Sequence, residues 1–478
     1  MEYYKIKIVF ALSLLAIVNV LPQPLITKNQ NSGFKFIKGV DISTLKQIED
    51  NNGVFKENNI LRDPIQIFKS HGINYIRLKL WHTPVNGYNN LANVLAVAQN
   101  VKNLGLKFLL DIHFSDTWAD PGHQTKPVNW NSLPFQSLKD SVYSYTKNVI
   151  TTFKKNGALP DIVQIGNEIS CGMLWNDGNV CGNFNTQAQW SKFAALLNEG
   201  IRGVKESLQS YDSIKIMIHI DKGGDVNDSQ WFFNKLNSYG VDFDIIGLSY
   251  YPWWQGTLTD LQNNLSNLIL RYNKEIIIVE TAYPWTLSWN DNTNNIVGNT
   301  DQLLPNYPAS ADGQKKFLLD LMNVVDNLPN DKGLGIFYWE PEWISTQTFG
   351  SPWENLALFD FNGNLLSSIS AFDSIATNVN DSENTIQQFC LYQNYPNPFN
   401  PITKISWQAQ VSGWQTLIIY DMLGNEIVTL VNEYRTAGNY EFDFNLRQNS
   451  SLKLASGIYY YQLKVGIYTK TKKMILLK

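Results

Sequence analysis

The feature that most constrains the fold of this chain is a series of eight short apolar runs, each rich in β-branched or aromatic residues. Because these runs are nearly continuous rather than alternating, they predict parallel strands that are buried on both faces. Helix-like stretches lie between them, so the repeated unit predicts an α/β fold, a (β/α)₈ TIM barrel. The runs cover residues 36–42, 73–80, 108–113, 162–166, 214–220, 245–250, 276–280 and 335–339, and the helix-like stretches include 64–70, 91–103, 138–155, 188–208, 258–272 and 314–328.

An open, doubly wound parallel sheet is the structural alternative. Such sheets bind nucleotides through a glycine-rich loop after their first strand. No loop of that kind follows residues 36–42, and the closed barrel is therefore the favoured fold.

Two glutamates occupy matching positions at the ends of apolar runs. Glu168 follows the fourth run and Glu280 ends the seventh, 112 residues later. The C-terminal ends of barrel strands line the active site of such folds, and a buried carboxylate is costly unless it is bonded or used. Two carboxyl groups facing one pocket suit glycosidic bond cleavage. An ion pair with a loop Lys or Arg is the alternative reading of each glutamate.

The first 22 residues predict a secretory signal peptide. Lys5 and Lys7 precede an almost wholly apolar run at residues 8–21, which is shorter than the roughly 20 residues of a membrane span. An uncleaved anchor or a lipid attachment is the alternative, although this segment has no Cys to carry a lipid. The net charge of −4 gives no indication of nucleic-acid binding.

Aromatic residues make up 13% of the chain and include 15 Trp. Aromatic faces stack on sugar rings, although many of these side chains must also serve core packing. Cys171 and Cys181 follow the fourth run. In an oxidising compartment they could form a disulfide, with two free thiols as the alternative. Zinc is disfavoured because no His pair is near them.

The chain is longer than one barrel requires, and its composition changes near residue 376. We expect a catalytic barrel at residues 35–375, a polar linker at 376–390 and a second domain at 391–478. Six short alternating runs with turn signals between them predict a small β-sandwich there. These runs lie at residues 405–410, 416–421, 426–431, 438–444, 457–465 and 470–477.

Several segments of the predicted barrel together resemble glycoside hydrolase family 53, the arabinogalactan endo-β-1,4-galactanases. The most specific of them is DIHFSDTWADPG at residues 111–122. The resemblance extends over residues 36–370, and its other segments are 39–43, 74–81, 164–168, 280–285, 335–341 and 353–355.

The resemblance implies a role for individual residues. Glu168 would be the general acid/base and Glu280 the nucleophile of a retaining double displacement, with their carboxyl groups about 5 to 5.5 Å apart. Asn167 would bind the sugar 2-hydroxyl, while Arg77 and Tyr251 would keep Glu280 ionised and oriented. No cofactor is required for this chemistry.

Other polar and aromatic residues lie at or after the predicted strands. For the polar ones we expect substrate binding, with structural pairing or a metal centre as alternatives; for the tryptophans we expect sugar platforms, with core packing as the alternative. The polar set is Asp111, His113, Asp116, His219 and Asp221; the tryptophans are Trp81, Trp118, Trp285, Trp339 and Trp353. Trp339, at the end of the eighth run, is the favoured platform at the cleaved bond.

A structural calcium ion is a further expectation, because some bacterial members of the family bind calcium after the seventh strand. Asp291 and Asn295 offer oxygen ligands in the corresponding loop. A solvated Asn-rich loop is the alternative.

The C-terminal region resembles the sorting domain of type IX secretion cargo. NYPNPFNP at residues 394–401 opens it, and YDMLG at 420–424 and ASGIYY at 455–460 continue it. This resemblance implies passage through the periplasm, export by the type IX machinery, and release or surface attachment. A carbohydrate-binding module is the alternative.

The sequence thus predicts a secreted, monomeric endo-acting hydrolase of plant cell-wall galactan. An endo-glycanase for β-mannan or β-glucan is the second hypothesis, since loops rather than strands distinguish these polymers. A non-catalytic glycan-binding surface protein is the third, and the presence of both Glu168 and Glu280 disfavours it.

Overall fold

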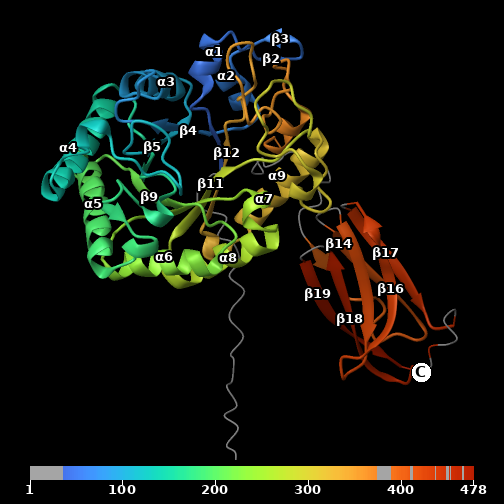
Figure 1. Ribbon diagram of the computed structural model, residues 1–478. Helices are drawn as coiled ribbons and strands as arrows, with labels where there is room; N and C mark the ends of the chain where they lie inside the picture. Colours follow the sequence, from blue (N-terminus) through green and yellow to red (C-terminus); the bar gives the residue numbers. More distant parts are fainter. Residues whose placement is uncertain are drawn as a thin grey trace, which may run out of the picture. The chain divides into compact units, whose positions relative to one another are not determined.

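The chain divides into two compact units, residues 1–377 and 378–478 (Figure 1). The computed structural model describes residues 36–373, 389–409, 413–436, 438–447, 452, 454–465 and 468–477. The expected signal peptide and residues 376–388 of the expected linker lie outside these ranges, so both stay predictions.

The first unit is a closed barrel of eight parallel strands, as the apolar runs predicted. Around the barrel the strands follow the order β1-β12-β11-β10-β9-β6-β5-β4. Along the chain, β6 is therefore the fourth barrel strand and β11 the seventh, which confirms the predicted positions of the two glutamate-bearing segments. The strands are β1 (Ile37–Asp41), β4 (Tyr75–Leu80), β5 (Lys107–Ile112), β6 (Ile162–Ile165), β9 (Lys215–Ile220), β10 (Ile245–Ser249), β11 (Glu275–Thr281) and β12 (Gly333–Trp339).

Closure of the barrel joins its first strand, β1, to its last strand, β12. Strand β1 pairs with β4 on one side and with β12 on the other, so that Asp41 lies level with both Arg77 and Trp339. Polar residues from the beginning and the end of the barrel thereby come to one place at the mouth.

The barrel core has two layers. Side chains such as Met217, Ile277 and Phe337 pack inside the barrel, and the outward faces of the strands pack against the helices. Gly39 gives the Phe337 ring its space, because a Cβ atom on Gly39 would lie 2.3 Å from that ring. Burying β-branched side chains on both faces is what holds the strands parallel and continuous.

Helices surround the strands in Figure 1. Side-chain caps fix several of their starts, such as Asp63 before α2 and Thr257, in a capping box, before α8. Helix α6, after the fifth strand, is not among the helix-like stretches named above. The side chain of Asp225 caps its start. The eighth strand is followed by the short 3₁₀ turn Ser367–Ala371. The helices are α1 (Leu45–Asp50), α2 (Pro64–Ser70), α3 (Leu91–Asn103), α4 (Phe135–Lys155), α5 (Gln187–Lys205), α6 (Val226–Ser238), α7 (Pro252–Gln255), α8 (Leu258–Tyr272) and α9 (Ala311–Asp326).

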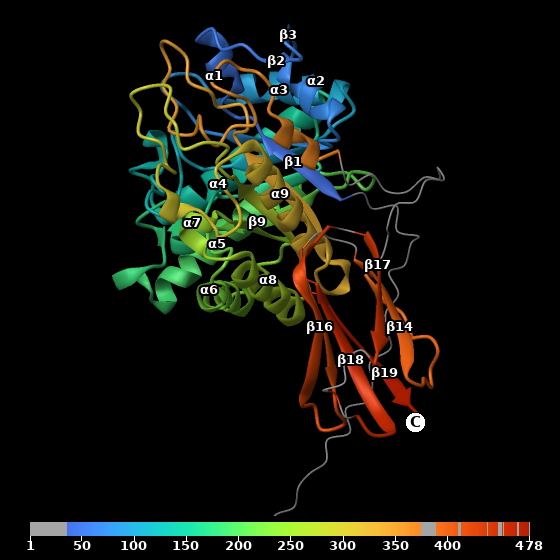
Figure 2. The ribbon, with the colours of Figure 1, turned by 90° about the vertical axis from the view of Figure 1, so that its right-hand side faces the viewer.

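The second unit consists of two antiparallel sheets with their own hydrophobic core, in which Trp407 and Tyr461 are buried. One sheet has the order β13-β14-β17 and the other β16-β15-β18-β19, and Figure 2 shows strands of both. All six predicted runs are strands, and the short β13 is an addition. The strands are β13 (Cys390–Leu391), β14 (Ile402–Ala409), β15 (Gly413–Tyr420), β16 (Glu426–Arg435), β17 (Gly438–Asn445), β18 (Gly457–Val465) and β19 (Tyr468–Leu476).

Short strand pairs also occur in the barrel loops. These are β2 (Lys56–Glu57) with β3 (Ile60–Leu61), and β7 (Gly172–Met173) with β8 (Gly178–Asn179). The disulfide Cys171–Cys181 flanks the second pair, which is the first of the two alternatives for these cysteines. Among the described residues, no helix is both long and apolar enough to cross a membrane.

Candidate active site

The C-terminal ends of the barrel strands surround a cavity of about 180 Å³ that contains both glutamates. Most of its lining comes from residues that directly end a strand or follow it, which is where a barrel places reactive groups. The lining residues are Asp41, Arg77, Lys79, Asp111, His113, Trp118, Ala119, Asp120, Asn167, Glu168, Tyr251, Trp254, Glu280, Trp339 and Trp353.

Glu280 is fixed in the cavity by a cation and a phenol. One oxygen lies 2.8 Å from Nη1 of Arg77, and the other accepts a hydrogen bond of 3.2 Å from the Tyr251 hydroxyl. Burial beside two carboxylates raises the pKa of Tyr251 well above its usual value, so this hydroxyl stays a neutral donor. Both oxygens of the Glu280 carboxylate are therefore held in a defined orientation.

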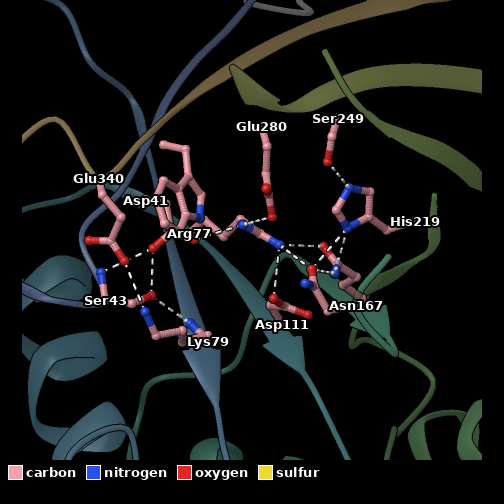
Figure 3. A network of polar contacts seen from close by, with 12 residues as sticks. Asp41, Ser43, Arg77, Lys79, Asp111, Asn167, His219, Ser249, Glu280 and Glu340 are labelled. Carbon is pink, nitrogen blue, oxygen red and sulfur yellow. Dashed lines mark hydrogen bonds and ion pairs between the residues drawn. The ribbon is translucent and has the colours of Figure 1, made fainter. Parts of the chain in front are cut away.

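The Arg77 guanidinium is the centre of a buried network that Figure 3 shows between Glu280 and Asp111. Its side chain is only 1% exposed. Nη1 donates to Asp41 at 2.8 Å, and Nη2 donates to Asp111 at 2.8 Å and to the Asn167 side-chain oxygen at 2.9 Å. A buried guanidinium needs such partners, and here one cation is shared by three carboxyl groups.

Glu168 has different surroundings. It lies three residues beyond the end of β6, with a left-handed backbone (φ 46°); such backbone strain in a residue other than glycine is typical of functional positions. Ser249, at the end of β10, donates a hydrogen bond of 2.6 Å to Oε1 of Glu168. Behind it, Nε2 of His219 lies 2.8 Å from the Ser249 hydroxyl.

Burial and charge separate the two glutamates electrostatically. Burial raises the pKa of Glu280 to about 7, against the opposing effect of Arg77. The pKa of Glu168 is raised well above its usual value by burial and then by the negative charges of Glu280 and Asp221. His219 is held neutral, since burial and the nearby Arg77 lower its pKa well below the usual value. Glu280 therefore loses its proton before Glu168 does.

A second buried group of charges adjoins the first. Nζ of Lys79 donates to Glu340 at 3.0 Å, and the other oxygen of Glu340 accepts from the Thr44 amide at 3.0 Å. Burial, and then the charge of Glu340, raise the pKa of Glu342 well above its usual value. The Glu340 carboxyl group therefore lies between Lys79 and the Thr44 amide, and burial favours the protonated form of the neighbouring Glu342.

The structure brings most of the predicted site residues to the cavity. Asp111, His113, Asn167, Tyr251, Trp118, Trp339 and Trp353 line it, and Trp81 lines an adjoining hollow. His113 donates to Asp111, with 2.9 Å between Nε2 and the carboxylate. The Trp339 and Trp353 rings lie 4.6 Å apart, edge to face.

Other predicted residues lie away from the cavity. Asp116 accepts the backbone amides of Thr83 and Val128 and thus joins two loops. Trp285 donates to a backbone carbonyl and packs on Phe361. Asp221 lines a neighbouring hollow of about 540 Å³, and His219 lies behind Ser249.

The expected calcium ion at Asp291 and Asn295 stays a prediction, and their side-chain oxygens have different surroundings. Both carboxylate oxygens of Asp291 accept backbone amides, from Thr293 and Ser351. The side-chain oxygen of Asn295 is buried without a partner, but calcium takes six to eight oxygen ligands. In the part of the chain that the structure describes, no group of three or more His, Cys, Asp or Glu side chains is placed to hold a metal ion.

Sequence reasoning missed several residues of the site. Ser249 could have been found, because it is a polar residue at the end of the sixth run. Lys79 and Glu340 also lie in or beside strand-end segments, but only barrel closure pairs them. Trp254 lies in α7, the short helix after β10; its 61% exposure, unusual for a tryptophan, is visible only in the structure.

A TIM barrel with two carboxyl groups of different proton affinity in one aromatic-lined cavity defines a glycoside hydrolase. Residues 37–372 match glycosyl hydrolase family 53, and the chain belongs to this family. Residues 393–477 match the secretion system C-terminal sorting domain, so the second unit is a sorting domain.

Individual relatives agree with this assignment. An uncharacterised protein of Niallia circulans is 48% identical over 344 residues, which are 70% of this chain and 93% of that protein. An arabinogalactan endo-β-1,4-galactanase of Thermothelomyces thermophilus is 35% identical over 71% of this chain and 99% of its own length. The solved structure of the Ignisphaera aggregans GH53 catalytic domain has a TM-score of 0.66 and 39% identity, covering 70% of this chain and 95% of that one.

Proposed function

We propose that this protein is a secreted, retaining endo-β-1,4-galactanase that cleaves galactan and arabinogalactan chains. The observation that carries the mechanism is the unequal environment of the two glutamates: Arg77 and Tyr251 bind Glu280, whereas Glu168 faces negative charge. The galactanase relative of Thermothelomyces thermophilus supports the choice of substrate.

In the first step Glu280 attacks the anomeric carbon, while Glu168 gives its proton to the departing glycosidic oxygen. A glycosyl ester on Glu280 results, and the negative charge that raised the pKa of Glu168 is lost. Glu168, now a carboxylate, takes a proton from water, and that water cleaves the ester. We assign binding of the 2-hydroxyl to Asn167, and the hydrogen bond that fixes its amide oxygen to Arg77 supports this role. The two carboxyl groups and water suffice for this chemistry.

Endo action is supported by hollows on both sides of the cavity. Lys79 and Trp118 line both the cavity and a hollow of about 260 Å³, and Trp254 lines both the cavity and the hollow beside Asp221. A chain can therefore extend past the reacting sugar in both directions.

The substrate is tested by assaying the purified protein on galactan, mannan and glucan. We expect hydrolysis of galactan, with internal cuts that lower its viscosity before much reducing sugar appears. Faster hydrolysis of mannan or glucan would overturn the substrate assignment, and binding of all three without hydrolysis would overturn the enzymatic one.

We further propose that the sorting domain directs export by the type IX machinery, through the periplasm, to the cell surface or the medium. Deletion of residues 391–478 should leave galactan hydrolysis per folded molecule nearly unchanged and retain the enzyme in the periplasm of the native host. If the purified truncation instead loses affinity for insoluble galactan, the domain also binds carbohydrate.

A further inference from the structure

Lys79 is a buried cation with unused hydrogen-bonding capacity at the edge of the cavity. Its side chain is 3% exposed. An ammonium group carries three N–H donors, and Glu340 is the one acceptor that the described residues give it. Burying a charged group is costly unless its donors are satisfied, so the remaining N–H groups require a partner.

Three indole rings surround this ammonium. Its Nζ lies 3.7 Å from the ring centre of Trp118, 5.7 Å from that of Trp81 and 6.0 Å from that of Trp339. A cation held against aromatic faces is attracted to them by the ring quadrupole. The same rings offer stacking surfaces for sugars, so polar and stacking contacts coincide here.

The position of Lys79 puts it beside the non-reducing part of the substrate, which stays bound to the enzyme when the leaving group departs. Glu168 must reach the departing oxygen, and Ser249 and Asp221 lie on its side of the site. Lys79 belongs instead to β4 and pairs with Glu340 next to β12, and it lines both the cavity and the hollow with Trp81 and Trp343. A sugar chain passing from the cavity into this hollow crosses the ammonium.

We propose that Lys79 is a substrate-binding residue that donates hydrogen bonds to the hydroxyls of the second sugar, next to the cleaved one on the non-reducing side. Glu340 acts through Lys79 as a positioning residue, since its two oxygens are fixed by Lys79 and the Thr44 amide. The inference rests on the proposed galactanase function and adds to it the residue that makes two sugars bind better than one.

The experiment compares two substrates with the same leaving group, 4-nitrophenyl β-galactoside and 4-nitrophenyl β-1,4-galactobioside. The full-length Lys79→Met variant should lose about ten- to a hundredfold in kcat/KM on the galactobioside. On the single galactoside its change should stay below about threefold, because the second sugar is missing. Equal losses on both substrates, or no loss on either, would overturn the proposal.

Two further variants separate binding from folding. Lys79→Met with Glu340→Gln removes the carboxylate that the single change leaves unpaired, and it should show the same selective loss on the galactobioside. Lys102→Met, which breaks the ion pair with Asp161 before β6, should leave the ratio between the two substrates as in the wild type. If the double variant kept the wild-type ratio of kcat/KM between the two substrates, the loss in the single variant would be due to disturbed packing. This result would overturn the proposal.

The proposed function and this inference fail in different ways. A wild-type enzyme that cleaves neither galactoside, nor galactan, contradicts the function. A wild type that prefers the galactobioside, with a Lys79→Met variant that keeps this preference, contradicts only the role of Lys79.

Discussion

The surroundings of Glu280 and those of Glu168 differ in the charge that faces each carboxyl group. Glu280 shares the Arg77 cation with Asp41 and Asp111, whereas the nearest partner of Glu168 is the uncharged Ser249 hydroxyl. Glu280 is buried and Glu168 is partly buried, and burial alone would raise the pKa of both. The difference therefore comes from the partners, and it sets the order in which the two protons leave.

Comparison of these two regions also shows what one cation can do. Because three carboxyl groups share Arg77, burial still raises the pKa of Glu280, to about 7. Arg77 thus orients Glu280, the proposed nucleophile, and opposes the rise of its pKa, rather than making Glu280 strongly acidic.

The largest expected effect comes from removing the nucleophile. Glu280→Gln should lower kcat on galactan and on nitrophenyl galactosides alike, on the order of 10⁴-fold or more, since no glycosyl ester can form. Steady-state kinetics on both substrates measures the loss. Activity on either substrate within tenfold of the wild type would contradict the role of Glu280.

Removing the acid should have an effect that depends on the leaving group. Glu168→Gln should lower kcat/KM on galactan by about 10²- to 10⁴-fold. On a dinitrophenyl galactobioside, which needs little protonation, a burst of released phenol should persist because the first step is spared. If the burst rate fell by the same factor as kcat/KM on galactan, Glu168 would have to do more than transfer a proton.

Exchanging the shared cation tests the Glu280 side. Arg77→Lys leaves three N–H donors for the three carboxyl groups and the side-chain amides that the guanidinium binds, so the pKa of Glu280 should rise, by about one to three units. The enzyme needs Glu280 ionised, and the acidic limb of the kcat/KM profile should therefore move to higher pH. If this variant folded normally and its acidic limb stayed at the wild-type pH, Arg77 would not control the pKa of Glu280.

The smallest effect is expected on the Glu168 side. Ser249→Ala removes a hydrogen bond that favours the Glu168 carboxylate, so the pKa of Glu168 should rise and the basic limb should move up, by about one unit or less. The acidic limb should not move. The pH profiles of kcat/KM for Ser249→Ala and Arg77→Lys, measured side by side, show whether the two regions act independently. A shift of the acidic limb in Ser249→Ala would contradict this independence.

The sequence predicted the barrel and both glutamates because each depends on local signals. Continuous β-branched runs indicate strands that are buried on both faces; Glu280 ends such a run, and Glu168 lies two residues beyond one. Arg77 also lies inside an apolar run, where a guanidinium needs ion-pair partners.

Contacts made by barrel closure could not be predicted in this way. Lys79 and Glu340 are 261 residues apart along the chain, and only the pairing of β1 with both β4 and β12 brings them together. Asp116 and Trp285 follow strands, as site residues do, but their hydrogen bonds are made to loop backbones. Sequence position identifies the end of a strand, whereas the direction of a loop side chain depends on distant contacts.

The stereochemistry of the product tests the central claim most directly, because retention requires Glu280 to act as nucleophile and Glu168 as acid and then base. In proton NMR spectra recorded during the first minutes of galactotetraose hydrolysis, the newly formed reducing end should be the β anomer, and the α anomer should grow in only by mutarotation. Immediate appearance of the α anomer would mean direct attack by water across a wider carboxyl separation, and it would contradict the roles given to both glutamates.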